Sequence, residues 1–262
     1  MVRFLVGAVA ALSSVPALAA PAPLAPIGKW QVDYDDAQCV AGREFGDKKS
    51  PLLLVLKPSP TSDVMQLLVA RKGPSARAVQ MPASLSFGTG APIEASELRY
   101  GVEGRFMRSI ILSGAQANAL TAGDRITWAG KGDLSLSTGT LDAVKKALAA
   151  CRTNLRQHWN VDMPAGSTRP QALTNLGNFF SSFDYPAQAL RGREEGRTAV
   201  VMMVDEKGAV QDCMVEVTSG IPTLDAQTCW ILKERAKFTP AKGSDGKPIR
   251  SVVSQAVSWK LR

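Results

Sequence analysis

The alternation of hydrophobic and polar residues in the first half of the chain predicts β-strands. Trp30, Val32 and Tyr34 alternate with polar residues, which is the period of a strand with one solvated face. Short apolar runs separated by glycine and proline predict further strands. They lie at residues 52–57, 64–71, 107–112, 125–128 and 133–136. We therefore expect a β-rich domain over residues 29–159.

A helical pattern ends this domain. Over residues 141–159 the apolar positions recur every three or four residues and form one stripe, which indicates a helix packed on the sheet. The stripe consists of Leu141, Val144, Leu148, Cys151 and Leu155. Thr140 is the expected N-cap. The stripe predicts core packing, so the helix is expected to close the domain.

The last third of the chain predicts a small α+β unit. The pattern gives strands at 197–204 and 209–217, a helix at 224–238 and a last strand at 250–261, an order of β-β-α-β. Gly208 supplies the positive φ of a hairpin turn after Asp205. Residues 160–172 are expected to be a linker before a domain at 173–262, and a short helix is expected at 171–180.

The N-terminus predicts export. Arg3 precedes an apolar stretch at residues 4–19 with small residues at Ala17 and Ala19, which is typical of a secretory signal cleaved before Ala20. A proline-rich segment without a fold of its own follows at 20–28. The expected location is the periplasm. The alternative is an uncleaved inner-membrane anchor, although the stretch is shorter than the ~20 apolar residues of a spanning helix.

Four cysteines in an exported protein favour disulfides. Cys213 on its strand and Cys229 on the apolar stripe of the next helix are expected to meet between helix and sheet. By elimination, Cys39 pairs with Cys151. The alternative for the first pair is two buried free thiols. With His158 as the single histidine and no CxxC pair, we expect no metal site and no cofactor.

Charge and motifs argue against nucleic-acid binding and catalysis. The net charge of +8 is scattered among acidic residues, whereas nucleic-acid binding needs a basic stripe. Ser219-Gly220 lacks the second glycine of a nucleophile elbow, and no glycines have phosphate-loop spacing. The carboxylate pairs Asp35-Asp36 and Glu194-Glu195 are expected to be solvated. We expect no enzyme activity.

An ordered set of turn and helix markers runs through residues 170–262. The set comprises Tyr185-Pro186, Gly196, Asp205 to Gly208, Ser219-Gly220, Leu224-Asp225, Phe238, Pro240-Ala241 and Asp245-Gly246-Lys247-Pro248. In order and spacing it resembles the C-terminal domain of TonB, the periplasmic energy transducer of Gram-negative bacteria. The resemblance implies a binding module.

The resemblance also implies a partner site. In the TonB family the last strand takes up a short peptide of an outer-membrane receptor, and the segment after the Tyr-Pro pair also faces the receptor. An exposed sheet edge offers unpaired backbone groups for such β-strand addition. The residues so implied are Ala187, Gln188, Leu190, Arg191, Arg250, Val252, Ser254, Ala256 and Ser258. Leu190 stands where TonB tends to have a polar residue, so the partner stays open.

Three functions follow from the sequence. A signal peptide and a globular domain replace the membrane helix and long proline-rich spacer of TonB, which favours a periplasmic adaptor. Such an adaptor would bind an outer-membrane TonB-dependent transporter or another envelope protein in transport across the envelope. The second function is an atypical transducer anchored in the inner membrane. The third is a purely structural or dimerising module, which would form a homodimer through the C-terminal domain.

Overall fold

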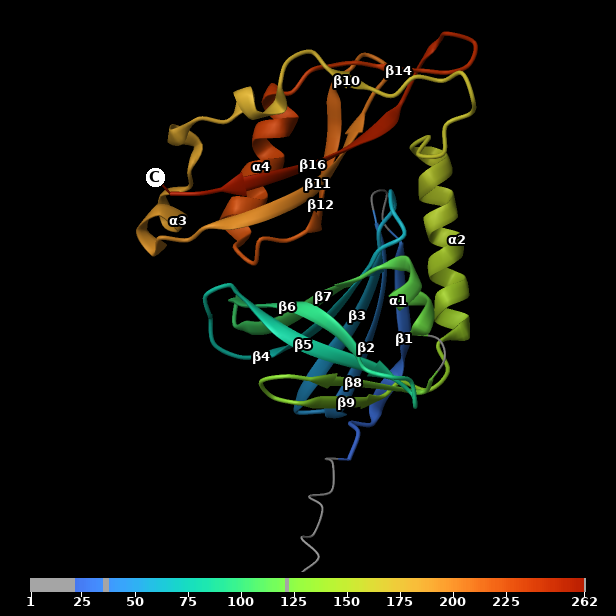
Figure 1. Ribbon diagram of the computed structural model, residues 1–262, viewed down its shortest axis with the longest axis vertical. Helices are drawn as coiled ribbons and strands as arrows, with labels where there is room; N and C mark the ends of the chain where they lie inside the picture. Colours follow the sequence, from blue (N-terminus) through green and yellow to red (C-terminus); the bar gives the residue numbers. More distant parts are fainter. Residues whose placement is uncertain (1–21, 35–37, 121–122, 262) are drawn as a thin grey trace, which may run out of the picture.

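The computed structural model describes residues 22–34, 38–120 and 123–261. The predicted signal at 1–19, the cleavage site before Ala20 and the Asp35-Asp36 pair lie outside the described residues. Within the described ranges, no helix has both the length and the apolar character needed to cross a membrane. Figure 1 shows two bodies, a β-barrel-like body and a smaller α+β body, with a long helix beside them.

The N-terminal body is a nearly closed antiparallel barrel. Its strands are β1 (Pro26–Tyr34), β2 (Cys39–Asp47), β3 (Ser50–Pro58), β4 (Met65–Lys72), β5 (Val79–Phe87), β6 (Ile93–Val102), β7 (Arg105–Leu112), β8 (Arg125–Ala129) and β9 (Leu134–Ser137). They form one sheet in the order β1-β2-β3-β4-β7-β6-β5-β8-β9. The Leu24 N–H donates to Ser135 O at 2.8 Å, and Ser137 N–H donates to Leu24 O at 3.0 Å. The segment before β1 therefore joins the two ends of the sheet.

The β-rich character of this body is confirmed, and each strand predicted from the pattern is present. Strands β2, β5 and β6 were not predicted. Gly42 in β2 and Pro82 in β5 break the apolar pattern, and β6 turns the charged residues Glu97 and Arg99 inward. The first strand starts at Pro26, inside the segment expected to have no fold of its own.

Helix α2 (Asp142–His158) packs against β1 and β2, while the short α1 (Gly114–Ala119) follows β7. All five residues of the predicted stripe join the core of the barrel. The prediction of Thr140 as N-cap is wrong: the cap position is Leu141, and its side chain makes no capping bond. The Cys39–Cys151 disulfide joins β2 to this helix, which confirms the predicted pair.

The C-terminal body is built on a three-stranded antiparallel sheet. Strands β11 (Gly196–Val204), β12 (Val210–Val217) and β16 (Ser251–Trp259) lie in the order β12-β11-β16, with α4 (Pro222–Arg235) on one face. Its other elements are β10 (Gln171–Ala172), 3₁₀ turns at Leu176–Phe179 and Ser182–Asp184, α3 (Ala187–Gly192), β13 (Phe238–Thr239), β14 (Ala241–Lys242) and β15 (Pro248–Ile249). The Cys213–Cys229 disulfide links β12 to α4, as predicted.

Two details of this body differ from the pattern. The predicted helix at 171–180 is wrong, because β10 pairs with β13 and only one 3₁₀ turn follows. Helix α4 ends at Arg235, since Ala236 is extended. The predicted Gly208 turn is present with φ of 82°. A Cβ atom at Gly208 would lie 1.9 Å from the carbonyl oxygen of Phe238, so the turn also has no room for a side chain at this position.

The segment at 160–172 lies against the C-terminal sheet. Val161 is buried with Val201, Met203 and Met214 on the face opposite α4, and Trp159 packs against the same cluster. Thr168 forms a bridge with Lys242. Because both faces of β11 are covered, its sequence reads as a continuous apolar run from Ala199 to Val204.

Candidate partner-binding edge of the C-terminal sheet

The sheet has two edge strands, and the barrel contacts one of them. At β12, Lys57 Nζ donates to the main-chain oxygen of Val215 at 3.0 Å. Burial lowers the pKa of Lys57, while the nearby Glu216 carboxylate opposes that shift. The same carboxylate accepts hydrogen bonds from the hydroxyl groups of Ser59 and Thr61. The end of β3 and the loop between β3 and β4 therefore contact the outer edge of β12 at Val215 and Glu216.

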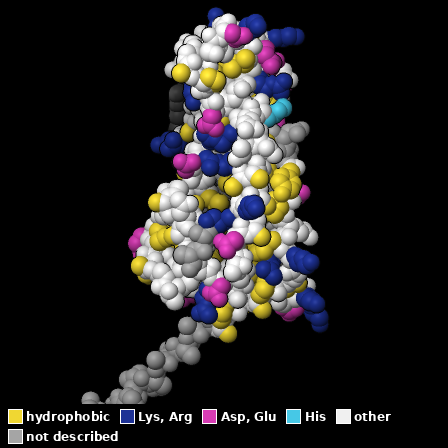
Figure 2. Space-filling view, turned by 90° about the vertical axis from the view of Figure 1, so that its right-hand side faces the viewer, with side chains coloured by type: hydrophobic (Ala, Val, Ile, Leu, Met, Phe, Trp, Pro, Cys, Tyr) yellow, Lys and Arg dark blue, Asp and Glu magenta, His cyan; other side chains and the backbone are white. Residues whose placement is uncertain are grey.

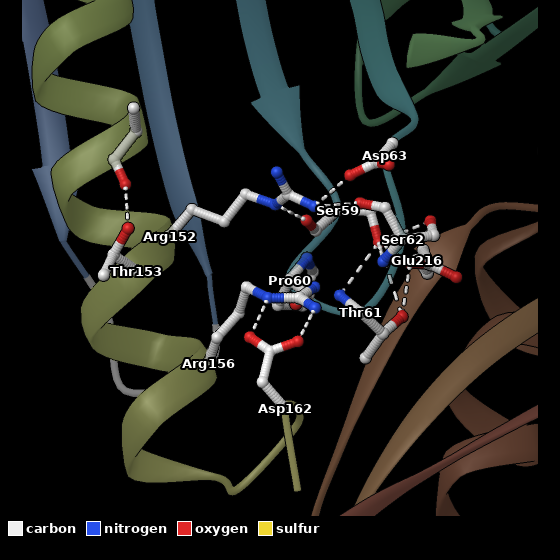
Figure 3. A network of polar contacts seen from close by, with 11 residues as sticks. Ser59, Pro60, Thr61, Ser62, Asp63, Arg152, Thr153, Arg156, Asp162 and Glu216 are labelled. Atoms are coloured by element: carbon white, nitrogen blue, oxygen red, sulfur yellow. Dashed lines mark hydrogen bonds and ion pairs between the residues drawn. The ribbon is translucent and has the colours of Figure 1, made fainter. Parts of the chain in front are cut away.

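Two arginines of α2 hold that loop in place (Figure 3). Arg152 donates to the carbonyl oxygens of Ser59 and Ser62 and pairs with Asp63 at 2.8 Å. Arg156 donates to Pro60 O at 3.0 Å and binds Asp162 through both ends of its guanidinium. The β12 edge is thus contacted at Val215 and Glu216 by the end of β3 and by a loop that is itself hydrogen-bonded to α2.

Gly220 of the Ser219-Gly220 pair makes a second contact between the C-terminal body and the barrel. Gly220 has φ of 80°, and a Cβ atom there would lie 2.8 Å from Cβ of Ala78 and 3.2 Å from Cβ of Tyr100. Nearby, Arg77 Nη2 donates to Gly192 O at 2.6 Å. The motif glycine is therefore needed for close approach of the barrel, which the sequence did not reveal.

The other edge strand, β16, has a defined orientation of its main-chain groups. It pairs with β11 from Ser251 to Trp259 without a bulge, so successive residues point their N–H and C=O groups to alternate sides. Leu261 N–H donates to Glu195, which precedes β11, whereas the carbonyl of Arg250 accepts from Asn160 on the opposite side. Odd-numbered residues of β16 therefore bond to β11, and even-numbered residues face outward.

The outward-facing positions are Val252, Ser254, Ala256 and Ser258. Ser254 and Ser258 are exposed and Ala256 is half-buried, whereas Val252 packs under Val161. Within the described residues, the one hydrogen bond recorded for these main-chain groups runs from Gln255 Nε2 to Ala256 O. The strand thus offers a free edge from Ser254 to Ser258.

Helix α3 carries the other predicted site residues. Ala187, Gln188, Leu190 and Arg191 are exposed, and Leu190 is 46% exposed despite being apolar. Ala189 is buried in the cluster that also contains Trp259 and Val257 of β16. The structure therefore brings α3 and the end of β16 to the same end of the molecule.

The Tyr-Pro motif explains this proximity. Rings of Tyr185 and Phe180 make edge contacts with Trp259 at centroid distances of 5.3 and 5.7 Å. Tyr185 also donates its hydroxyl to Glu194 O at 2.5 Å, and Trp259 Nε1 donates to Thr228 at 2.9 Å. The motif thus anchors α3 beside the last strand.

Arg250 and Val252 lie at the opposite end of β16. The Arg250 guanidinium contacts Glu206 and His158 at 3.4 and 3.3 Å. Arg250 is held by Glu206 and His158, and Val252 packs against Val161. Because both lie at the end of β16 away from α3, they do not form one surface with that helix.

Two buried carboxylates explain further motif residues. Asp225 of the Leu-Asp pair accepts from Thr198 at 2.6 Å and from the N–H of Ser219 at 2.9 Å, which ties α4 to β11 and to the end of β12. Asp184 binds Arg235 at 2.7 Å, and the hydrogen bonds from Arg235 hold its pKa at about 2. Both carboxylates therefore have a structural role, because they connect elements within the C-terminal body.

The edge presents main-chain N–H and C=O groups, and the described residues place no cluster of metal ligands beside it. No cluster of three potential metal ligands exists among them. Figure 2 shows basic and acidic side chains interspersed on the face that carries His158, without a basic stripe.

These features define a small α+β module with β16 at one edge of its sheet, and most of this module matches a known family. Residues 181–261 match the family described as the Gram-negative bacterial TonB protein C-terminal. The last third of the chain is therefore similar to the C-terminal domain of this family. No curated protein and no solved structure matches the chain.

Proposed function

We propose that this protein is a periplasmic adaptor that binds an envelope protein by β-strand addition to β16. The partner is an outer-membrane TonB-dependent transporter or another envelope protein, and the role is in transport across the envelope. The TonB C-terminal domain at 181–261 supports this assignment, since domains of this family act as transducers or binding modules rather than enzymes. The predicted signal at residues 1–19 supports the periplasmic location.

The orientation of β16 is the observation that carries the proposal. Ser254, Ala256 and Ser258 present N–H and C=O groups outward on an edge that carries no other strand in the described part of the chain. An extended segment laid antiparallel or parallel to this edge would form main-chain hydrogen bonds, each contributing about 0.5–1.5 kcal/mol net. Several such bonds give affinity with little demand on side chains.

The exposed face of α3 would supply the side-chain contacts. Leu190 and Gln188 are exposed beside the end of β16, and an apolar residue such as Leu190 favours an apolar side chain on the partner. A partner strand running past Ser258 would reach this helix. In this proposal the barrel contacts β12 at Val215 and Glu216 and so hinders strand addition there, which favours β16 as the edge that the partner uses.

The first prediction tests the edge directly. Proline at Ser254 or Ser258 removes an outward N–H without removing a bond to β11. Each change should weaken binding of the envelope partner, captured by cross-linking to the wild-type protein, by about twofold to tenfold. Titration of the purified partner against the full-length protein measures the effect.

Alanine at the same two positions is the matched control, because it removes the same hydroxyl and keeps the N–H. Circular dichroism checks that the proline variants fold. If both folded proline variants bind like wild type while substitutions in the barrel abolish binding, the partner does not add a strand at β16.

A further inference from the structure

The mouth of the barrel near the β8–β9 turn contains a cavity of about 320 Å³. It lies at the lower end of the range of about 300–1,000 Å³ that ligand pockets span, and barrel mouths are common places for them. Four cationic side chains line it: Arg71, Arg99, Arg108 and Lys131. Its apolar walls include Leu52, Phe106 and Leu134.

The inward-facing residues of β4 and β7 change from apolar to basic toward this mouth. Along β4 the row runs from Leu67 through Val69 to Arg71, and along β7 it runs from Ile110 to Arg108. Deeper in the barrel the same rows are apolar and fully buried. Core packing favours an apolar residue at the buried position of Arg108, so this arginine calls for another explanation, while Arg71 is exposed at the opening.

The buried charges at the base of the cavity do not balance. Glu97 is fully buried and accepts from Arg99, from Arg108 at 2.8 and 3.0 Å, and from Trp128 at 2.8 Å. Burial opposes ionisation of Glu97, yet the hydrogen bonds from Arg108 and Arg99 hold its pKa below the usual value. One carboxylate thus serves two arginine side chains that are each 9% exposed.

Arg99 is the unsatisfied member. Its Nη2 atom is buried without a hydrogen-bond partner among the described residues, while Arg108 also donates to Gly132 O at 2.6 Å and lies over the Trp128 ring. A buried N–H donor without a partner is unfavourable, and an anion supplied from outside would satisfy it.

The rim adds to the positive charge. Arg71 and Lys131 are exposed at the opening, and Arg71 lies 5.7 Å from the centre of the Phe106 ring. The acidic residue on the cavity wall, Asp133, is exposed and accepts from the N–H of Gly130 at 3.0 Å. The opening therefore attracts anions, and screening by salt would weaken that attraction.

We propose that this mouth binds a small organic anion, a carboxylate or phosphate group attached to an apolar body. The anionic group would lie against Arg108, Arg99 and Arg71, and the apolar body along Phe106, Leu134 and Leu52. An inorganic ion would leave these apolar walls unused. This site lies in the barrel and shares no residue with the β16 edge. The proposal of anion binding is therefore independent of the proposal of strand addition.

The test is calorimetric titration of the full-length protein with octanoate and with octyl phosphate. At least one of them should bind, and the stronger of the two identifies the preferred oxyanion. Octanol, which has the same chain without the charge, should not saturate the site, and inorganic phosphate should bind more weakly than octyl phosphate. Binding should weaken as the salt concentration rises.

Arg71→Gln should weaken the binding of the preferred probe by about tenfold, because it removes one charge-assisted contact at an exposed position. Lys72→Gln is the matched control: it removes the same charge from the next residue of β4, which is exposed and outside the cavity lining. Its effect should be less than about twofold. Absence of binding by both probes, equal binding of octanol, or equal losses in the two variants would overturn the proposal.

Discussion

Replacing Cys39 and Cys151 together by alanine should lower the free energy of unfolding by about 2–5 kcal/mol. The two residues are 112 positions apart in the sequence, so their disulfide restricts a long loop of the unfolded chain. It also fixes α2 on β2, and α2 supplies Arg152 and Arg156 to the loop that covers β12. Urea denaturation followed by tryptophan fluorescence measures the change.

The Cys213–Cys229 bridge is the internal comparison. Its sequence separation is 16, for which the loop-entropy account gives about 3 kcal/mol. Alanine replacement of this pair should therefore cost less than replacement of the first pair. An unchanged unfolding midpoint in the Cys39→Ala, Cys151→Ala protein would show that this disulfide does not stabilise the fold.

The second large effect is expected at Glu97. Glu97→Gln should lower the free energy of unfolding by about 3–5 kcal/mol, because it leaves the buried Arg99 and Arg108 without their counter-charge. The new amide NH₂ would also face N–H donors of Arg108 or Trp128 that the carboxylate now satisfies. The same denaturation experiment measures it.

Glu94→Gln provides the control, since Glu94 is exposed on the same strand and makes the same change in charge. Its effect should stay within about 0.5 kcal/mol. Equal stability of the Glu97→Gln and Glu94→Gln proteins would mean that the carboxylate does not hold the two arginines. High concentrations of octanoate should not restore the Glu97→Gln protein to wild-type stability, because Glu97 lies beneath the arginines.

Much of the fold could be predicted from local chemistry. The Gly208 turn follows from a backbone conformation that favours glycine, and both disulfides follow from an even cysteine count with Cys213 and Cys229 placed face to face. Strands such as β3 and β4 follow from apolar runs bounded by turn residues. These signals are local, so they can be recognised in the sequence without knowing which elements pack together in the fold.

The missed elements depend on tertiary partners. Strand β6 was not predicted because Glu97 and Arg99 point inward, at positions where the alternation of a half-buried strand requires apolar residues. Thr140 looks like a cap in sequence, but the structure places Leu141 at that position without a side-chain bond. Residues 171–172 form a strand because β13 lies beside them. None of these outcomes is encoded within a short window.

The candidate site was predictable as a strand and not as an edge. Within the predicted strand at 250–261, the side chains of Val253, Val257 and Trp259 pack on the α4 side. Which N–H groups face outward depends on the register with β11. Coverage of β12 by Lys57 depends on a barrel loop far away in the sequence. Both facts needed the structure.

Amide hydrogen exchange along β16, resolved by residue in the full-length protein, tests the central claim most directly. We predict slow exchange at Val253, Gln255 and Val257, whose N–H groups face β11, and fast exchange at Ser254, Ala256 and Ser258. Added partner should slow the second set alone. Slow exchange of both sets in the free protein would contradict a free edge, and protection of Ser254, Ala256 and Ser258 that grows with protein concentration would assign the edge to a second copy of this chain.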